Sequence, residues 1–440
     1  MTTNDEPPEP GIAESLLPNR EISCRGESSH APYGGLPTNT ESGLLAGVRV
    51  LDMTNVLAGP FAGYQLALMG ADVVKVETPG TGDLARQLGA SRELSEHRLG
   101  VSFLAQNSGK RSITVNLKSD GGRRIFERLV AGADVLLENF RPGVLARLGF
   151  DWERLRTINP RLVYCAVSGF GATGPMSQRP AYDQVIQGLS GMMSVTGTPD
   201  TAPLRVGFPI CDSFGGLAAA FAVVSALLRQ RSTGQGAYLD TSMLDAAITS
   251  MGWVVSDHLI AGREPMPMGN ENVTSAPSGT FETGDGDLNI AANKQEQYET
   301  LCTVLDRPEL LTDPRFVTRE DRKRNRDELR EELQRSLKTK SAREWDDILL
   351  GTGVPAAPVV SVPTALRSQQ IRHRELVSEV ELATGGGKTV EVLGSPTRVD
   401  GASVRPASRA PRLGEHTEAV LGELGFTGEE IAALREEGAI

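Results

Sequence analysis

The feature that most constrains the fold is an alternation of short apolar runs with helical segments. The runs "VRVLDM" (48–53) and "ADVVKVE" (71–77) flank "GPFAGYQLALMG", in which Pro60 stands near the start of a predicted helix. The same rhythm of helix and strand returns over residues 121–140 and 145–171. Helices that alternate with short β-branched strands predict a parallel sheet covered on both faces. We therefore predict an α/β fold with a Rossmann-like large domain.

Composition shifts divide the rest of the chain. Residues 1–44 are acidic at their start, rich in Pro, Gly, Ser and Thr, and lack the basic and apolar regions of a signal peptide, which predicts a disordered leader. The large domain is expected over 45–240 and a linker helix over 241–267. A hairpin with a "GDGD" turn and a charged helical stretch predict a smaller α+β domain over 268–368. A C-terminal segment, 369–440, is expected to return to the large domain.

Charge and cysteine usage exclude several classes of protein. The net charge of −11 argues against a nucleic-acid partner, because phosphates demand a basic face. The four cysteines are far apart and form no CxxC pair, and none of the five histidines has a partner at metal-ligand spacing. We therefore predict no metal site and a reducing, cytoplasmic location. No run reaches the roughly 18–20 unbroken apolar residues of a membrane span, so no membrane association is expected.

Several nucleotide-binding and hydrolase motifs are missing. The first strand-to-helix turn reads "NVLAGPFAG" rather than G-x-G-x-x-G, although Glu77 ends the second strand where a ribose-binding acid would lie. The glycine-rich stretch 168–183 has neither the lysine nor the spacing of a P-loop, and no G-x-S-x-G elbow occurs. Dinucleotide binding and serine hydrolysis are therefore disfavoured.

One carboxylate stands in unusually apolar surroundings. Asp212 lies in "GFPICDSFGG", directly before the apolar run "LAAAFAVVSALL". It could be the N-cap of a helix, a position that aspartate favours. It could also be a nucleophile, because a helix N-terminus favours an ionised carboxylate and Gly215 and Gly216 would let a bulky substrate approach the backbone. The residues alone leave both interpretations open.

Ordered motifs along the chain add a family resemblance. They include "LAGVRVLDMTNVLAGPFAGYQLALMGADVVKVETPGTGD", "NSGKRSITVNLKSDGG", "ADVLLENFRPGVLARLGFDWERLRTINPRLVYCAVSGFGATGP", "AYD" and "ICDSFGG". From about residue 45 to about residue 440 the sequence resembles the class III CoA-transferases. That family includes formyl-CoA transferase and carnitine-type CoA-transferases, and has α-methylacyl-CoA racemase as a relative.

The resemblance implies a role for Asp212 as the nucleophile that attacks an acyl-CoA thioester. Coenzyme A would then be a substrate, and no permanently bound cofactor would be needed. A racemase is the alternative, but its "GHD" motif has histidine where this chain has Tyr182, whose pKa near 10 makes it a poor base at neutral pH. A CoA-ester binder with a decayed site is disfavoured because Asp212 is intact.

The family's CoA contacts carry over onto a small set of positions: Val56, Ala58, Asn139, Arg147 and Tyr182. By the same resemblance, Arg147 would pair with a phosphate of the ADP moiety, and the family's architecture implies an interlocked, ring-like homodimer. Lys110 and Arg111 are positive neighbours for which a role in the fold is an equal alternative.

Departures from formyl-CoA transferase bear on the substrate. Leu57 replaces a glutamine and Thr78 replaces an arginine of that enzyme, which argues against formyl or oxalyl specificity. The stretch 177–197 is closer to members that handle succinyl-type or other dicarboxylic CoA esters, whose distal carboxylate Arg179 or Arg205 could bind. The family's mobile glycine loop would fall at "GNENVTSAPSG" (269–279), without the run of glycines.

Overall fold

A computed structural model describes residues 43–384 and 386–440. These residues belong to the unit Leu36–Ile440. The predicted leader, 1–44, lies outside the described residues except for its last two.

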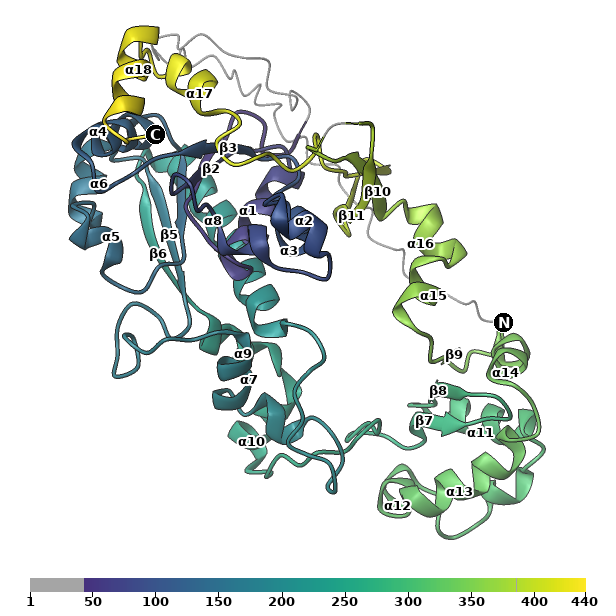
Figure 1. Cartoon of the computed structure of the whole chain (residues 1–440). Helices are drawn as coiled ribbons and strands as arrows, with labels where there is room; N and C mark the ends of the chain where they lie inside the picture. The colour runs from purple at the N-terminus through teal and green to yellow at the C-terminus, as the bar shows by residue number, and fades with distance from the viewer. Residues whose placement is uncertain (1–42, 385) are drawn as a thin grey trace, which may run out of the picture. The chain divides into compact units, whose positions relative to one another are not determined.

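A six-stranded parallel sheet forms the centre of the large domain (Figure 1). Its order is β3-β2-β1-β4-β5-β6, which is the strand order of the Rossmann fold. The strands are β1 (Arg49–Asp52), β2 (Asp72–Glu77), β3 (Arg111–Thr114), β4 (Val135–Glu138), β5 (Val163–Ser168) and β6 (Ala237–Ser242). The prediction of an α/β fold with a Rossmann-like parallel sheet is confirmed.

Helices connect these strands, as parallel strands require, and two more helices follow β6. In chain order they are α1 (Ala58–Leu68), η1 (Leu84–Gln87), α2 (Arg92–Glu96), α3 (Val101–Asn107), α4 (Asp120–Ala131), α5 (Val144–Arg147), α6 (Trp152–Ile158), α7 (Asp183–Leu189), η2 (Met192–Val195), α8 (Ile210–Thr233), α9 (Met243–Ser250) and α10 (Trp253–Ala261).

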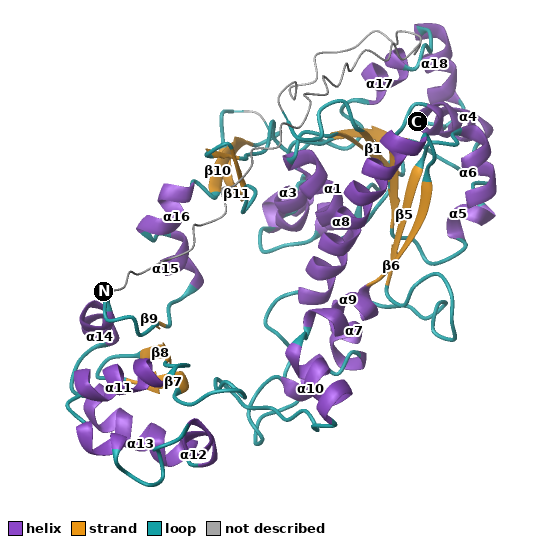
Figure 2. Cartoon of the chain, turned by 180° about the vertical axis from the view of Figure 1, so that it is seen from behind, coloured by secondary structure: helices purple, strands orange, loops and turns teal. Residues whose placement is uncertain are grey.

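The sheet has a hydrophobic core on each face. Leu51 and Leu136 point to one face, where they pack with α4, α6 and the two C-terminal helices α17 (Thr417–Glu423) and α18 (Gly428–Glu436). Their neighbours Val50 and Val135 point to the other face, where α1, α7, α8 and α9 lie (Figure 2). This alternation follows from the two-residue period of a strand.

A second group of elements follows α10. An antiparallel sheet of β7 (Ser278–Glu282), β8 (Asp287–Ala291) and β9 (Ala356–Pro358) packs with its helices around a core of its own. Those helices are α11 (Gln295–Val304), η3 (Pro308–Leu311), α12 (Arg319–Arg324), α13 (Arg326–Leu337) and α14 (Ala342–Leu349). The predicted hairpin is present, with the last residue of "GDGD" already in β8.

The remaining elements join this group to the C-terminal helices. They are α15 (Val362–Leu366), α16 (Gln369–Arg374), β10 (Val377–Glu381), β11 (Thr389–Leu393), β12 (Arg398–Val399) and β13 (Ala402–Ser403). The expected linker helix over 241–267 is instead the end of β6 followed by α9 and α10. Met243 and Ala247 of α9 lie in the core of the large domain, so this segment is part of that domain's packing.

Helix α8 departs from the expectation about membranes. By length and composition, Ile210–Thr233 is apolar enough to cross a bilayer. In the structure, α8 packs against α1, α7, α9, β5 and β6, and its buried face includes Ala219 and Val223. A core helix of a soluble protein passes the same test, so one such helix is weak evidence for a membrane span.

Candidate active site

Asp212 lies within the first turn of α8 but is not its N-cap. The helix begins at Ile210 after Pro209, so Asp212 is the third helical residue. The N-cap interpretation is therefore wrong. The acceptor comes from another helix: Asp183, the first residue of α7, accepts hydrogen bonds at Oδ1 from the backbone N–H of Cys211 (2.8 Å) and of Asp212 (3.4 Å). A carboxylate 29 residues before Asp212 thus accepts the hydrogen bonds expected of a local cap.

Asp183 is itself held in place by α7 and by the segment before α8. Gln187, one helical turn later, donates from Nε2 to Asp183 Oδ2 at 2.7 Å. The same amide accepts from the backbone N–H of Val206 (2.9 Å) and donates to the carbonyl of Phe208 (3.2 Å). Arg205 Nη2 lies 3.6 Å from Asp183 Oδ2. Asp183 and Gln187 are buried, so this network fixes the chain that leads into the turn carrying Asp212.

The surroundings of Asp212 oppose its ionisation. Burial, and next to it the charge of Asp183, raise the pKa of the Asp212 carboxyl to about 7. The helix N-terminus was expected to keep this carboxylate ionised, and here that influence is outweighed. Asp212 is therefore a carboxylate of unusual basicity that is half ionised near neutral pH, as a nucleophile in a desolvated site requires.

The glycine pair after Asp212 serves helix packing. A Cβ on Gly216 would lie 2.3 Å from the carbonyl oxygen of Ala58, and one on Gly215 would lie 3.0 Å from Met243 Cγ. Both glycines are therefore in close contact with α1 and α9. The expectation that they give a substrate room is wrong, because that space is filled by protein. Their effect is to bring the turn of α8 that follows Asp212 against the N-terminus of α1.

Three of the predicted CoA contacts, Asn139, Val56 and Ala58, lie close to where β1 and β4 end. Asn139 accepts from the backbone N–H of Asn55 (2.7 Å) and donates to the Asn55 carbonyl (2.8 Å). Val56, next along the loop, has φ +69° and donates its N–H to Asp83 Oδ1 at 2.9 Å. The loop between β1 and α1, with Ala58 at the helix start, is thus clamped at the edge of the sheet where strand order reverses, which is where α/β folds bind ligands.

The other two candidates leave their side chains exposed. Tyr182 precedes Asp183 at the start of α7 and is 68% exposed. Arg147, the last residue of α5, is exposed, and no carboxylate lies within ion-pair distance of it in the described part of the chain. Both positions are compatible with contacts to a ligand at the surface.

Lys110 and Arg111 have protein partners instead. Lys110 Nζ is fully buried and lies 2.8 Å from Asp52 Oδ2 and 2.9 Å from the carbonyl of Pro60. Arg111 pairs with Asp72 (2.6 Å) and Glu423 (2.7 Å). The sequence left open whether Lys110 and Arg111 contact CoA or stabilise the fold. These ion pairs give both residues a role in the fold. Lys110 in particular is enclosed and cannot meet a phosphate.

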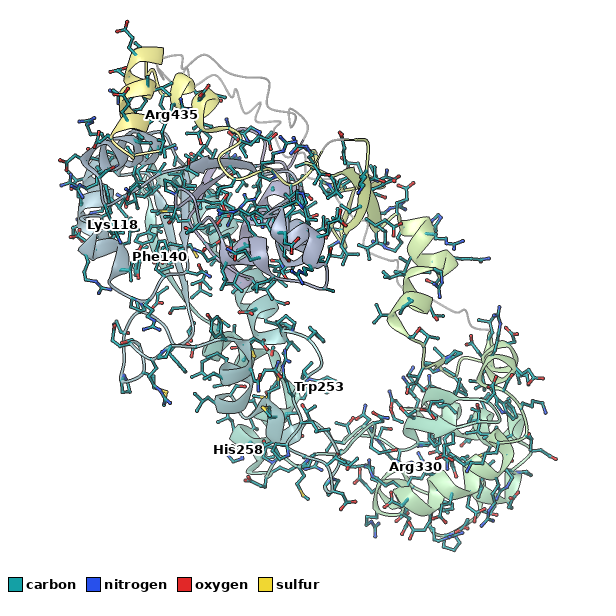
Figure 3. All side chains as sticks on the ribbon, viewed as in Figure 1. Lys118, Phe140, Trp253, His258, Arg330 and Arg435 are labelled. Carbon is teal, nitrogen blue, oxygen red and sulfur yellow. The ribbon has the colours of Figure 1, made fainter. Side chains whose placement is uncertain are left out.

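Glu77 and the loop 269–279, for which the sequence suggested ligand chemistry, also make contacts within the protein. Glu77 is buried and accepts from Arg86 Nε (2.8 Å) and from the hydroxyl of Ser112 (2.6 Å), so it is not placed to bind a ribose. In the predicted loop 269–279, the Glu271 carboxylate pairs with Arg326 and Arg330 of α13, the latter labelled in Figure 3. These contacts tie the loop to the smaller domain.

Sequence reasoning missed Asp183, Gln187 and Asp83. Asp183 was visible in the motif "AYD", but only as the end of a glycine-rich loop. Its spacing from Gln187, four residues on one helix face, was the available signal. Nothing in the local sequence of Asp83 indicates that it accepts from Val56, because that contact joins the ends of two separate strands.

Comparison with known proteins defines the class of this chain. The model of CoA-transferase family III matches residues 45–417. The chain is 39% identical to the acetyl-CoA:oxalate CoA-transferase of Acetobacter aceti over 86% of this chain and 95% of that protein. It is 34% identical to the human succinyl-CoA:glutarate CoA-transferase over 90% of each. A CAIB/BAIF family protein from Brucella suis superposes with a TM-score of 0.76 at 37% identity, covering 86% of this chain and 99% of that one.

The chain therefore belongs to CoA-transferase family III. It is a class III CoA-transferase, with CoA thioesters as substrates, and the resemblance drawn from the motifs is confirmed.

Proposed function

We propose that this enzyme moves CoA between carboxylic acids through a covalent intermediate on Asp212. A carboxylate oxygen of Asp212 attacks the thioester carbonyl, the C–S bond breaks, and CoA thiolate leaves from a mixed anhydride. The thiolate then attacks the aspartyl carbonyl carbon, which releases the first carboxylic acid as its carboxylate and leaves an aspartyl-CoA thioester. The observation that carries the proposal is a half-buried carboxylate in the first turn of α8 whose pKa is raised to about 7.

The second half of the cycle reverses these steps with a new acid. The incoming carboxylate attacks the aspartyl thioester and expels CoA thiolate, which gives a second mixed anhydride. The thiolate attacks the acyl carbonyl of the acceptor, and the Asp212 carboxylate leaves. Every bond made is matched by one broken, and no redox group or metal takes part. The described residues contain no group of three or more side chains suited to hold a metal ion.

We propose dicarboxylic acids of the succinyl type as substrates. Several relatives are named for succinate, glutarate or mesaconate transfer, and one for oxalate. Tyr182, which stands where the racemase relative has histidine, supports transfer over racemisation. The test is a panel of succinyl-, acetyl- and oxalyl-CoA against carboxylate acceptors in D₂O. We expect CoA transfer without deuterium at the α-carbon, whereas α-exchange without transfer would favour the racemase.

Arg205 is the better placed of the two candidate arginines for the distal carboxylate of such a substrate. It reaches Asp183, whose other oxygen binds the backbone of Asp212, while Arg179 lies 6.0 Å from the ring of Phe170. Arg205→Ala is expected to raise the ratio of KM for a dicarboxylate to KM for acetate about tenfold or more, the scale of a charged hydrogen bond. Arg179→Ala is the matched control. An equal rise in KM for the dicarboxylate and for acetate, or a rise seen only in Arg179→Ala, would refute this assignment.

We propose that the enzyme is a homodimer that covers one face of α8. Exposed apolar side chains recur every three or four residues along this helix: Phe214, Leu217, Phe221, Val224 and Leu228. Phe221 is 76% exposed and Leu228 is 73% exposed. Such a stripe indicates a partner surface.

The three cysteines in the described residues are free and buried, which supports the proposed cytoplasmic location.

Sedimentation tests the dimer. The unmodified chain should sediment as a dimer, and Phe221→Asp with Leu228→Asp should shift it to a monomer, because two buried charges would be unpaired in the interface. Leu350→Asp, at an apolar side chain 80% exposed after α14, is the control and should remain dimeric. A doubly substituted chain that still dimerises would place the interface elsewhere.

A further inference from the structure

Asp183 caps α8, but capping requires neither its burial nor its charge beside the nucleophile. It is 5% exposed, and its Oδ1 accepts from the N–H of the nucleophile's own residue and of the residue before it. A neutral side chain such as serine or asparagine satisfies helix N–H groups equally well. Here a buried carboxylate lies beside the half-buried Asp212, where like charges interact more strongly than in water.

We propose that Asp183 is the positioning residue of this site and that its charge drives acylation of Asp212. The inference rests on the proposed function. When Asp212 is a free carboxylate, its negative charge is repelled by that of Asp183, whose Oδ1 lies 3.4 Å from the Asp212 backbone nitrogen. When Asp212 becomes an anhydride or a thioester it is neutral, and the repulsion is relieved. Asp183 therefore destabilises the resting enzyme relative to both covalent intermediates, while its hydrogen bonds hold the turn that aims Asp212.

The charges around α8 support this assignment. Among the elements packed on α8, α1 carries no charged side chain, and Asp245 of α9 and Asp240 of β6 do not shift the pKa of Asp212. Asp183 does, because its charge adds to the effect of burial in raising that pKa. Arg205, 3.6 Å from Asp183 on its solvent side, is 43% exposed at its side chain and offsets the charge only in part.

Asp183→Asn separates the two roles, because the amide keeps an acceptor oxygen for the helix N–H groups and removes the charge. With acetyl-CoA as donor at pH 8, we expect the fraction of enzyme trapped by hydroxylamine at Asp212 to fall at least about tenfold, the factor that accompanies one pKa unit. The midpoint of the acid limb of kcat/KM should move below 7. Asp245→Asn, which removes a carboxylate from another helix packed on α8, should change neither quantity.

Arg205→Ala should act in the opposite direction. It removes the cation beside Asp183, so with acetyl-CoA the midpoint should rise and the trapped fraction should be at least that of the unmodified enzyme. This variant also covers the case in which Asp183→Asn fails to fold. If Asp183→Asn folds and traps acetyl groups like the unmodified enzyme with the same midpoint, the proposal is wrong and the proposed function stands. An unmodified enzyme that is not trapped at Asp212 would instead overturn the proposed function.

Discussion

Replacement of Asp212 by asparagine is expected to abolish CoA transfer and to stabilise the fold at the same time. The amide is no nucleophile, so kcat should fall at least about a thousandfold, as when the nucleophile of a covalent mechanism is removed. The amide also places no charge at this half-buried position. Because the pKa of Asp212 is raised from 3.8 to about 7, and one unit is worth about 1.4 kcal/mol, the free energy of unfolding should rise by about 2–4 kcal/mol at pH 8.

The sign of this effect depends on pH. The folded-state pKa lies above the unfolded one, so the favourable contribution of the neutral acid is complete below pH 3.8 and is lost as the pH rises through about 7. The difference between Asp212→Asn and the unmodified chain in urea unfolding should therefore be large at pH 8 and shrink to about 1 kcal/mol at pH 4.5. Asp245→Asn is the control. A difference independent of pH would show that the Asp212 carboxyl titrates normally. Transfer by the unmodified enzyme should in turn decline below pH 7.

Replacement of Lys110 by methionine is expected to cost about 3–5 kcal/mol in the free energy of unfolding, the range for removal of one partner of a buried ion pair. The side chains of Lys110 and Asp52 are fully buried. Burial alone would raise the pKa of Asp52, but Lys110 and Lys75 lower it to about 2, so removal of Lys110 takes away the main partner of a fully buried carboxylate. Urea unfolding measures the loss.

Lys118→Met provides the matched comparison, since Lys118 is exposed and follows β3, the strand that Lys110 directly precedes (Figure 3). It should change stability by less than about 0.5 kcal/mol. The two variants also decide between the roles left open for Lys110. A Lys110→Met protein that is as stable as the unmodified chain but binds CoA much more weakly would return this lysine to the ligand site.

Much of the fold could be predicted from the sequence because the apolar pattern that indicates a strand lies within a few consecutive residues. Val50 and Leu51, like Val135 and Leu136, lie in short apolar runs whose neighbours point to opposite faces of the sheet, and those runs were recognisable one by one. The resemblance implied a Rossmann-like domain, and the strand order itself is seen only in the structure. The division between domains was less visible, because α9 is as apolar as a linker helix would be yet packs on α8.

The site was only half predictable, for a physical reason. Asp212 stood out because a charge in an apolar run is costly and needs an explanation. The group that caps its helix and shifts its pKa is 29 residues away in sequence, and the partner of Lys110 is 58 residues away. Such contacts are created by the packing of α7 on α8 and of α1 on the sheet. These contacts cannot be inferred from the spacing of residues along the chain.

The central claim is that Asp212 becomes covalently modified during turnover. The direct measurement is peptide mass spectrometry after incubation with succinyl-CoA and quenching with hydroxylamine, with Asp212→Asn treated in parallel. The account predicts a hydroxamate on Asp212 in the unmodified enzyme and no modification of the corresponding peptide in the variant. Transfer that proceeds with Asp212 unmodified, or with the hydroxamate on another carboxylate, would contradict it.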